Sequence, residues 1–347
     1  MNESLILQAR NVQKDYKVRT RSGWGKVNFS AISDINLEVA AGETVCIVGE
    51  SGCGKSTLAR VLANLSPASQ GKVLFHGQSI DALSGADRKA MRKSVQFIFQ
   101  DPYASLNPRL TLGQIIAEPL ENFTHMSRTE QKERVALTLE RVGLNAADAN
   151  RRPKELSGGQ RQRVGIARAI IADPEVIIAD EAVSALDVSV KSQILNLLSD
   201  LQRERGMAYV FITHDVSVVR SIADRLVVMY LGRVMETGSA EEILARPRHP
   251  YTRMLLSAVP VPDPSRPMAM EVSHDEIPSA LNPPQGCVFR TRCRLADEAC
   301  KTRPPITIDA QGVATSCHHL DRVSEHVPAH QLQAPKHVVP VASNNLK

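Results

Sequence analysis

The chain has 347 residues, 43% hydrophobic and 23% charged, so it is long enough for two domains and can bury a sizeable core. Its 42 basic and 37 acidic residues give a net charge of +5, which is mild and not gathered into a tail, so no nucleic-acid partner is indicated. The N-terminus lacks a signal-peptide pattern and no apolar run approaches the length of a membrane span, so we expect a cytoplasmic protein that meets a membrane only through a partner.

The opening of the chain is predicted to be rich in β-strand. Residues 5–16 and 31–39 alternate apolar and polar side chains, which is the period of a half-buried strand. A polar, glycine-bearing loop separates them. The apolar run 45–48 is the next strand candidate.

A phosphate-binding loop is predicted directly after that strand. Its glycines permit backbone angles that a Cβ would forbid, so the loop N–H groups can turn inward, and the following helix aims its positive end at the same point. Lys55 has the reach to hold β- and γ-phosphates, and the Ser56 hydroxyl can ligate Mg²⁺. A chance match in a glycine-rich turn is the alternative, and the flanking strand and helix argue against it. The predicted phosphate-binding residues are Gly49, Glu50, Ser51, Gly52, Cys53, Gly54, Lys55, Ser56 and Thr57.

A second helix start with exposed N–H groups lies downstream. Residues 113–143 have a helical pattern, with Ser127 and Glu130 as a capping box. An amphipathic helix to Ile171 then begins after a serine and two glycines. A single nucleotide site does not need two phosphate-binding segments so far apart in the sequence. We therefore expect the second segment to bind another subunit's nucleotide. The stretch is Leu156, Ser157, Gly158, Gly159 and Gln160.

Polar residues end three apolar strand candidates. Gln100 follows residues 95–99, Asp180 and Glu181 follow residues 176–179, and His214 follows residues 209–212 after one threonine. The carboxyl edge of a parallel sheet is where ligands bind, so Asp180 would serve Mg²⁺ and Glu181 would polarise an attacking water. The alternatives are a polar strand terminus for Gln100, an acidic helix cap for the carboxylate pair and a structural role for His214.

Together these motifs resemble the nucleotide-binding subunit of an ATP-binding-cassette (ABC) transporter, over residues 4–258. The resemblance implies an α/β fold, with a P-loop NTPase core around a mainly parallel sheet, an antiparallel β subdomain and a helical signature subdomain. It also implies roles for the residues already named. Gly49 to Thr57 would be the Walker A loop, Gln100 the Q-loop glutamine that senses Mg²⁺, Leu156 to Gln160 the signature, Asp180 the Walker B carboxylate, Glu181 the catalytic glutamate, Asp187 a D-loop residue and His214 the switch histidine.

In that family two nucleotide domains sandwich two ATP molecules. Ser157 and Gly159 would then face the γ-phosphate bound by a partner's loop, which accounts for the second cradle. Tyr16 is the aromatic nearest the position where such ATPases stack adenine, and a simply packed aromatic on a strand is the alternative.

The C-terminal part narrows the resemblance to the ATPase subunits of bacterial oligopeptide and dipeptide importers. The stretches that carry it are 99–109, 248–252 and 286–293. This resemblance implies that the chain drives peptide import as a peripheral subunit at the cytoplasmic face of the inner membrane. Its implied partners are two permeases, a solute-binding protein and a second cassette ATPase, which is either a paralogue or another copy of this chain. Relatives with this ending also import nickel, glutathione or oligosaccharides. The loop from Gln100 to Arg109 would receive a permease helix, with Tyr103 and Leu106 as contacts.

Two rival functions are weaker. A soluble cassette ATPase acting on DNA or the ribosome usually has a coiled-coil insertion or a tandem second cassette, and this chain has neither. A non-catalytic regulatory subunit would not need Glu181 and His214.

Four of the six cysteines, Cys287, Cys293, Cys300 and Cys317, lie in the last fifth of the chain. In a cytosolic protein such a group favours a metal site over disulfides. The ligand count matches a [4Fe–4S] cluster, which some peptide-importer subunits carry. The alternatives are zinc with four thiolates, zinc with His318 or His319 replacing one, and free cysteines packed as small hydrophobes.

The predicted domains are an ATP-binding cassette at residues 1–258, a Pro-rich linker at 259–284, a small cysteine domain at 285–326 and a disordered tail at 327–347.

Overall fold

The computed structural model describes residues 5–19, 26–184, 186–258 and 278–323, and its centre is a sheet of eight strands. Five of these strands, in the order β9-β3-β8-β7-β6, run parallel, and β10, β12 and β11 extend the β9 side by antiparallel pairing. The bounds are β3 Thr44–Val48, β6 Val95–Ile98, β7 Val176–Asp180, β8 Ala208–Ile212, β9 Arg225–Tyr230, β10 Arg233–Ser239, β11 Ile306–Ile308 and β12 Ala314–Ser316.

The inner strands are apolar because both faces of the sheet are covered. Every residue of β3, β7 and β8 is buried, as expected for parallel strands between two layers. One core forms between the sheet, α1 and the N-terminal strands, and a second one forms on the opposite face. The helices that surround the sheet are α1 Lys55–Leu62, α2 Gly85–Ser94, α3 Pro102–Ser105, α7 Val188–Arg205, α8 Val216–Ile222, α9 Ala240–Ala245 and α10 Pro250–Ser257.

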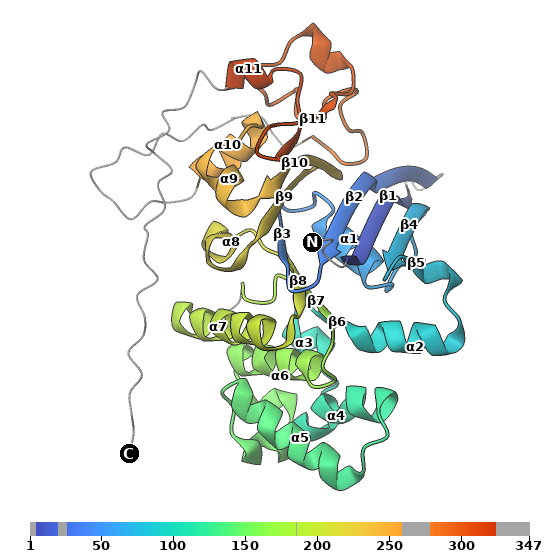
Figure 1. Ribbon diagram of the computed structural model, residues 1–347, viewed down its shortest axis with the longest axis vertical. Coiled ribbons are helices and arrows are strands. Elements are labelled where there is room, and N and C mark those ends of the chain that lie inside the picture. Colours follow the sequence, from blue (N-terminus) through green and yellow to red (C-terminus); the bar gives the residue numbers. More distant parts are fainter. Residues whose placement is uncertain (1–4, 20–25, 185, 259–277, 324–347) are drawn as a thin grey trace, which may run out of the picture.

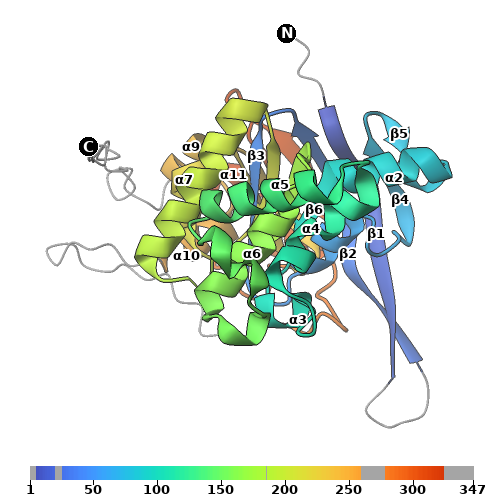
Figure 2. The same cartoon turned by 90° about the horizontal axis from the view of Figure 1, so that it is seen from below.

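The N-terminal strands form a separate antiparallel sheet in the order β2-β1-β4-β5. The strands predicted from alternation at both ends of the polar loop are present, and they pair with Val12 opposite Ile35. Figure 2 shows this pair as a long ribbon that projects beyond the rest of the molecule. The bounds are β1 Leu5–Arg19, β2 Lys26–Ala40, β4 Gln70–Phe75 and β5 Gln78–Ser79.

A helical part lies at the end of the molecule opposite the C-terminal strands (Figure 1). It consists of α4 (Leu112–Phe123), α5 (Arg128–Arg141) and α6 (Gly158–Ile170). The predicted capping box of Ser127 and Glu130 begins α5. The long helical pattern predicted from 113 therefore divides into two helices.

The C-terminal region that contains the four cysteines has little regular structure. We call residues 285–323 the cysteine module; it contains η4 (Glu298–Lys301), β11, β12 and α11 (Leu320–Val323). Strand β12 pairs with β10, so the module continues the cassette's own sheet. Most of the predicted linker and the whole predicted tail lie outside the described residues.

Among the described helices, none is both long enough and apolar enough to cross a membrane.

Candidate nucleotide site

The loop after β3 has the backbone that the sequence predicted. Gly49, Gly52 and Gly54 all have positive φ. A Cβ at Gly49 would run into the carbonyl oxygen of Met229, and one at Gly54 into that of Ala31. The glycines at these two positions are therefore required by close packing as well as by backbone angle.

Lys55, the first residue of α1, lies inside this loop. It is only 6% exposed, and its Nζ donates to the carbonyl oxygens of Gly49 at 2.7 Å and Glu50 at 2.9 Å. Burial raises the pKa of the neighbouring Cys53 thiol, although the Lys55 charge acts in the opposite direction. A protonated thiol beside a buried ammonium leaves Lys55 as the charge that a phosphate would meet.

Ser56 and Asp180 bring two oxygen ligands together from distant parts of the chain. The Ser56 Oγ donates to Asp180 Oδ1 at 3.0 Å, and Asp180 is the last residue of the buried strand β7. Burial raises the pKa of Asp180, the Ser56 hydrogen bond lowers it, and the adjacent Glu181 charge raises it again. Hydroxyl and carboxylate oxygens are ligands that Mg²⁺ prefers, so the pair fits that ion.

Glu181 is the point where three strand ends converge. Its carboxylate accepts from Gln100 Nε2 at 2.7 Å and lies 3.5 Å from His214 Nδ1. Its φ is 47°, a left-handed conformation that is rare for a residue with a side chain. The Glu181 N–H donates to the Ile212 carbonyl of β8, which holds the turn. A carboxylate fixed in this way can orient a water molecule.

The second predicted cradle is also a helix start. Ser157 caps α6, with its Oγ accepting from the Gln160 N–H at 3.3 Å and the Gln160 side chain accepting from the Ser157 N–H at 3.0 Å. Leu156 is buried, while Ser157 and Gly158 are exposed. No hydrogen bond joins this stretch to the loop at Gly49 within the described residues. Asp187, exposed, begins α7.

Tyr16 lies on β1 and packs against a neighbouring strand. Its ring stacks on Phe29 with centroids 5.8 Å apart, and Lys14 Nζ lies 5.4 Å from its centroid. Stacking on adenine stays a prediction.

One sequence expectation is corrected here. Tyr103 is 67% exposed, but Leu106 is 2% exposed and belongs to the main core. Leu106 therefore supports the loop from beneath and is not available as a surface contact.

The structure adds residues that sequence reasoning missed. Arg292 of the cysteine module and Tyr251 of α10 both bind Glu50 of the loop. Arg292 is 242 residues from Glu50, so no local pattern could have linked them. In the sequence it stood out only as the neighbour of Cys293.

The four C-terminal cysteines, Cys287, Cys293, Cys300 and Cys317, are free thiols. Burial is the main cause that raises the pKa of Cys287, of Cys317 and of Cys293, the last to about 12, and neighbouring cysteines of the group add to it. Ligand atoms of Asp297, Cys300 and His319 lie within 4.8 Å of one another. Asp297 was not predicted. His318 instead lies 3.2 Å from the Thr302 carbonyl.

Comparison with known proteins identifies the chain. Residues 32–184 match the ABC transporter family, and residues 235–300 match the oligopeptide/dipeptide transporter C-terminal region. The chain is 50% identical over 317 residues to a probable peptide ABC transporter ATP-binding protein, y4tS, of Sinorhizobium fredii, covering 90% of this chain and 89% of that protein. The chain belongs to the ABC transporter ATPase family.

A further relative and a solved structure support the same family assignment. The oligopeptide transport ATP-binding protein OppF of Escherichia coli is 47% identical over 91% of this chain and 97% of its own length. A solved ATP-binding cassette, MJ0796, dimeric and bound to ADP and Pi, is 32% identical, with a TM-score of 0.62 over 68% of this chain and 99% of that chain. The predicted α/β P-loop fold, family and ATPase activity are confirmed.

Proposed function

We propose that this ABC ATPase hydrolyses MgATP to drive the import of di- or oligopeptides. The observation that carries the catalytic part is the convergence of Gln100 and His214 on Glu181, beside the Ser56–Asp180 pair. The substrate class is supported by the match of residues 235–300 and by the peptide transport names of the relatives.

Each residue of the nucleotide site then has a role. The loop from Gly49 to Thr57 binds the phosphates through its N–H groups, and Lys55 leaves its carbonyl partners to bind the β- and γ-phosphates. Ser56, Asp180 and Gln100 would hold Mg²⁺, directly or through water. Glu181 takes a proton from the attacking water, and His214 stabilises the γ-phosphate.

The exposed helix start at Ser157 completes a second nucleotide site. We infer that Ser157, Gly158, Gly159 and Gln160, with Asp187, bind ATP held by a second cassette, because Ser157 and Gly158 are exposed and, within the described residues, no hydrogen bond joins this helix start to the chain's own phosphate-binding loop. The second cassette is a paralogue or another copy of this chain.

The transport partners follow from the same proposal. Two permease subunits would hold the chain at the cytoplasmic face of the inner membrane, and a solute-binding protein would deliver the peptide. The loop from Gln100 to Arg109 joins Glu181 to the surface and would carry the permease contact through the exposed Tyr103.

Purification from membranes tests this function. The chain, isolated in mild detergent, should bring two permeases and a second cassette with it, and peptides presented by the binding protein should stimulate its ATPase activity. Nickel, glutathione and oligosaccharides serve as controls. Stimulation by one of these and not by peptides would redirect the substrate class.

We also propose a metal centre in the cysteine module, with Cys287, Cys293, Cys300 and Cys317 as ligands of a [4Fe–4S] cluster. Four free thiols would supply the donor set, and the cluster would hold together a segment with few regular elements. A tetrahedral zinc site brings its thiolates to about 3.8 Å of one another. Within the described residues, the one group of three or more such ligand atoms that all lie within 4.8 Å of one another is Asp297, Cys300 and His319, so the four thiols do not form an equally compact set.

Iron, zinc and sulfide analysis of anaerobically purified protein distinguishes the possibilities. Iron and acid-labile sulfide with broad visible absorbance support the cluster. One equivalent of zinc without iron would support a site built on Cys300, His319 and Asp297 in its place.

A further inference from the structure

The cysteine module reaches the nucleotide site at one residue, Glu50 of the phosphate-binding loop. Arg292 Nη1 donates to Glu50 Oε2 at 2.8 Å, and Arg292 Nη2 donates to Glu50 Oε1 at 3.0 Å. This is the two-pronged pairing that fixes a carboxylate in orientation as well as in position. The Arg292 side chain is 7% exposed and that of Glu50 is 20% exposed, so water screens the pair only weakly.

Glu50 is held at its backbone as well. Its N–H donates to the Tyr251 hydroxyl at 2.9 Å, and its carbonyl accepts from Lys55 at 2.9 Å. Phe289 of the module packs against Tyr251 and Tyr230, with ring centroids 5.4 and 5.3 Å apart. Tyr230 Oη also accepts from Arg292 Nη1 at 3.3 Å. The loop conformation at Glu50 therefore depends on side chains that the module positions.

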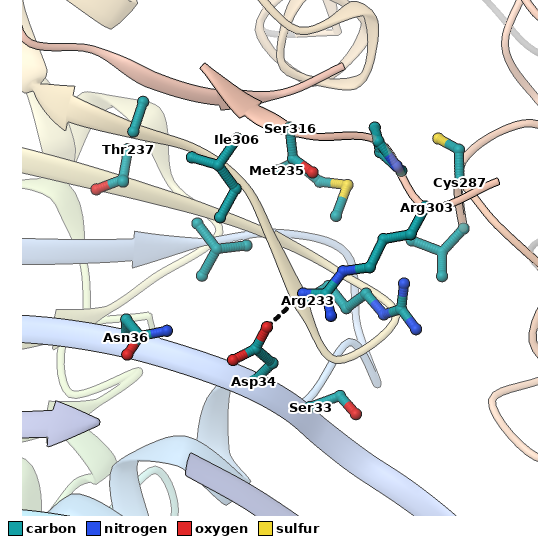
Figure 3. Close-up of a pocket in the computed structure, with 14 residues that line it drawn as sticks. Ser33, Asp34, Asn36, Arg233, Met235, Thr237, Cys287, Arg303, Ile306 and Ser316 are labelled. Carbon is teal, nitrogen blue, oxygen red and sulfur yellow. Dashed lines mark hydrogen bonds and ion pairs between the residues drawn. The ribbon is translucent and has the colours of Figure 1, made fainter. Parts of the chain in front are cut away.

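The module is fixed to the cassette independently of Arg292. Strand β12 pairs with β10, and Arg303 Nη2 donates to Asp34 Oδ2 at 2.5 Å on the N-terminal sheet. Figure 3 shows this second ion pair across a cavity of about 180 Å³ that is also lined by Arg233 and Cys287. Because the module has these other anchors, Arg292 is presented to Glu50 from a fixed place.

We propose that Arg292 is a positioning residue of the nucleotide site, and that the loop is ready for phosphate only while the cysteine module is docked. Two effects act in the same direction. The pair fixes the loop backbone before the nucleotide arrives, which removes an ordering cost from binding. It also neutralises a carboxylate that lies in the loop itself and would otherwise repel the phosphates. The proposal rests on the MgATP-binding function proposed above.

The test measures MgATP affinity of the full chain by calorimetry, with Arg292→Gln. We expect affinity to fall by about tenfold, which corresponds to roughly 1.4 kcal/mol. Hydrolysis at saturating ATP should fall much less, because Arg292 touches no reacting group. Arg292→Lys keeps the charge but not the two-pronged geometry, so its loss should be intermediate.

Two further variants separate positioning from a general loss of stability. The double variant Arg292→Gln with Glu50→Gln should recover only part of the affinity, because it removes the uncompensated carboxylate from the loop but does not restore the pair that fixes the loop backbone. Arg303→Gln removes the other ion pair of the same module, and it should lower the melting temperature without changing affinity by more than about twofold.

The outcomes are distinct. Wild-type chain that does not bind MgATP would contradict the proposed function itself. Wild-type chain that binds, with Arg292→Gln binding equally well or losing no more than Arg303→Gln, would overturn the inference. Full recovery of affinity by the double variant would also overturn the positioning role, because it would show that Arg292 acts only by neutralising the charge of Glu50.

Discussion

The nucleotide site and the cysteine module are built in opposite ways. The first is assembled at the carboxyl ends of β3, β6, β7 and β8, so a buried sheet holds its side chains in place before any ligand binds. The second consists mostly of loops, with a short η4, two three-residue strands and a short α11. The nucleotide site is therefore supported mainly by the buried sheet, whereas the module depends more on its contacts with the cassette, such as the pairing of β12 with β10.

The largest effect is expected at the rigid site. Glu181→Gln should lower ATP hydrolysis by at least about 100-fold, because the amide cannot accept a proton from water. MgATP binding should stay nearly intact, and an ATP-bound dimer should accumulate. Turnover assays and gel filtration with ATP measure this, with Lys55→Ala as the contrasting variant that loses affinity. Near-normal turnover would remove Glu181 from the proposed catalytic role.

The module should respond to loss of a thiol in a different way. Cys300→Ser should abolish binding of the proposed metal and lower the free energy of unfolding by several kcal/mol, since the proposed centre would supply much of the stability of a segment with so little regular structure. MgATP affinity should fall with it through Arg292. Metal analysis and thermal unfolding follow the change, and His318→Ala is the control because His318 lies outside the ligand group. Unchanged metal content in Cys300→Ser would exclude the proposed ligand set.

The loop after Gln100 offers a third contrast, between two residues three positions apart. Leu106→Ala should cost about 2–5 kcal/mol of stability, because Leu106 is in the core. Tyr103→Ala should leave stability and basal hydrolysis almost unchanged and abolish peptide-stimulated hydrolysis in the assembled transporter. If Tyr103→Ala also lowered basal hydrolysis of the isolated chain, the loop would be only a structural support.

The smallest effect concerns His249, where α10 meets the module. Complete burial lowers its pKa from about 6.5 to about 3, and its Nδ1 accepts from the Tyr251 N–H at 3.0 Å. The unfolded chain binds a proton there below pH 6.5 and the folded chain does not, so His249 makes stability fall as pH drops from about 6.5 toward about 3.

His249→Asn tests this pH dependence, because asparagine can also accept the bond that begins α10. The variant should be slightly less stable at neutral pH and should lose stability less steeply on acidification, measured by urea unfolding across that range. The buried Glu236 titrates in both proteins and cancels in the comparison. Parallel pH profiles would assign the acid sensitivity to other groups.

The sequence predicted the features that depend on residues close together in the chain. The strand, glycine loop and helix around Lys55 are contiguous, and the capping box at Ser127 is three residues wide. The meeting of Gln100, Glu181 and His214 was also predictable, since ends of parallel strands share one edge.

The features that the sequence did not predict depend on contacts between segments that are far apart in the chain. The Arg292–Glu50 pair, the pairing of β12 with β10 and the approach of Asp297 to Cys300 and His319 carry no local pattern. Leu106 was misplaced for a related reason. In an irregular loop no period indicates which side chain faces inward.

The pairing of β12 with β10 has a consequence for any shortened form of the protein. A chain cut after α10 would leave the β10 backbone groups opposite Thr315 and Ala314 without partners, and an open strand edge of this kind recruits other chains. In the intact protein the outermost strand is β11, only three residues long, although Ile306 and Ile308 are 64% and 67% exposed on it. We therefore expect the isolated cassette to aggregate in proportion to its concentration, whatever the state of its nucleotide site.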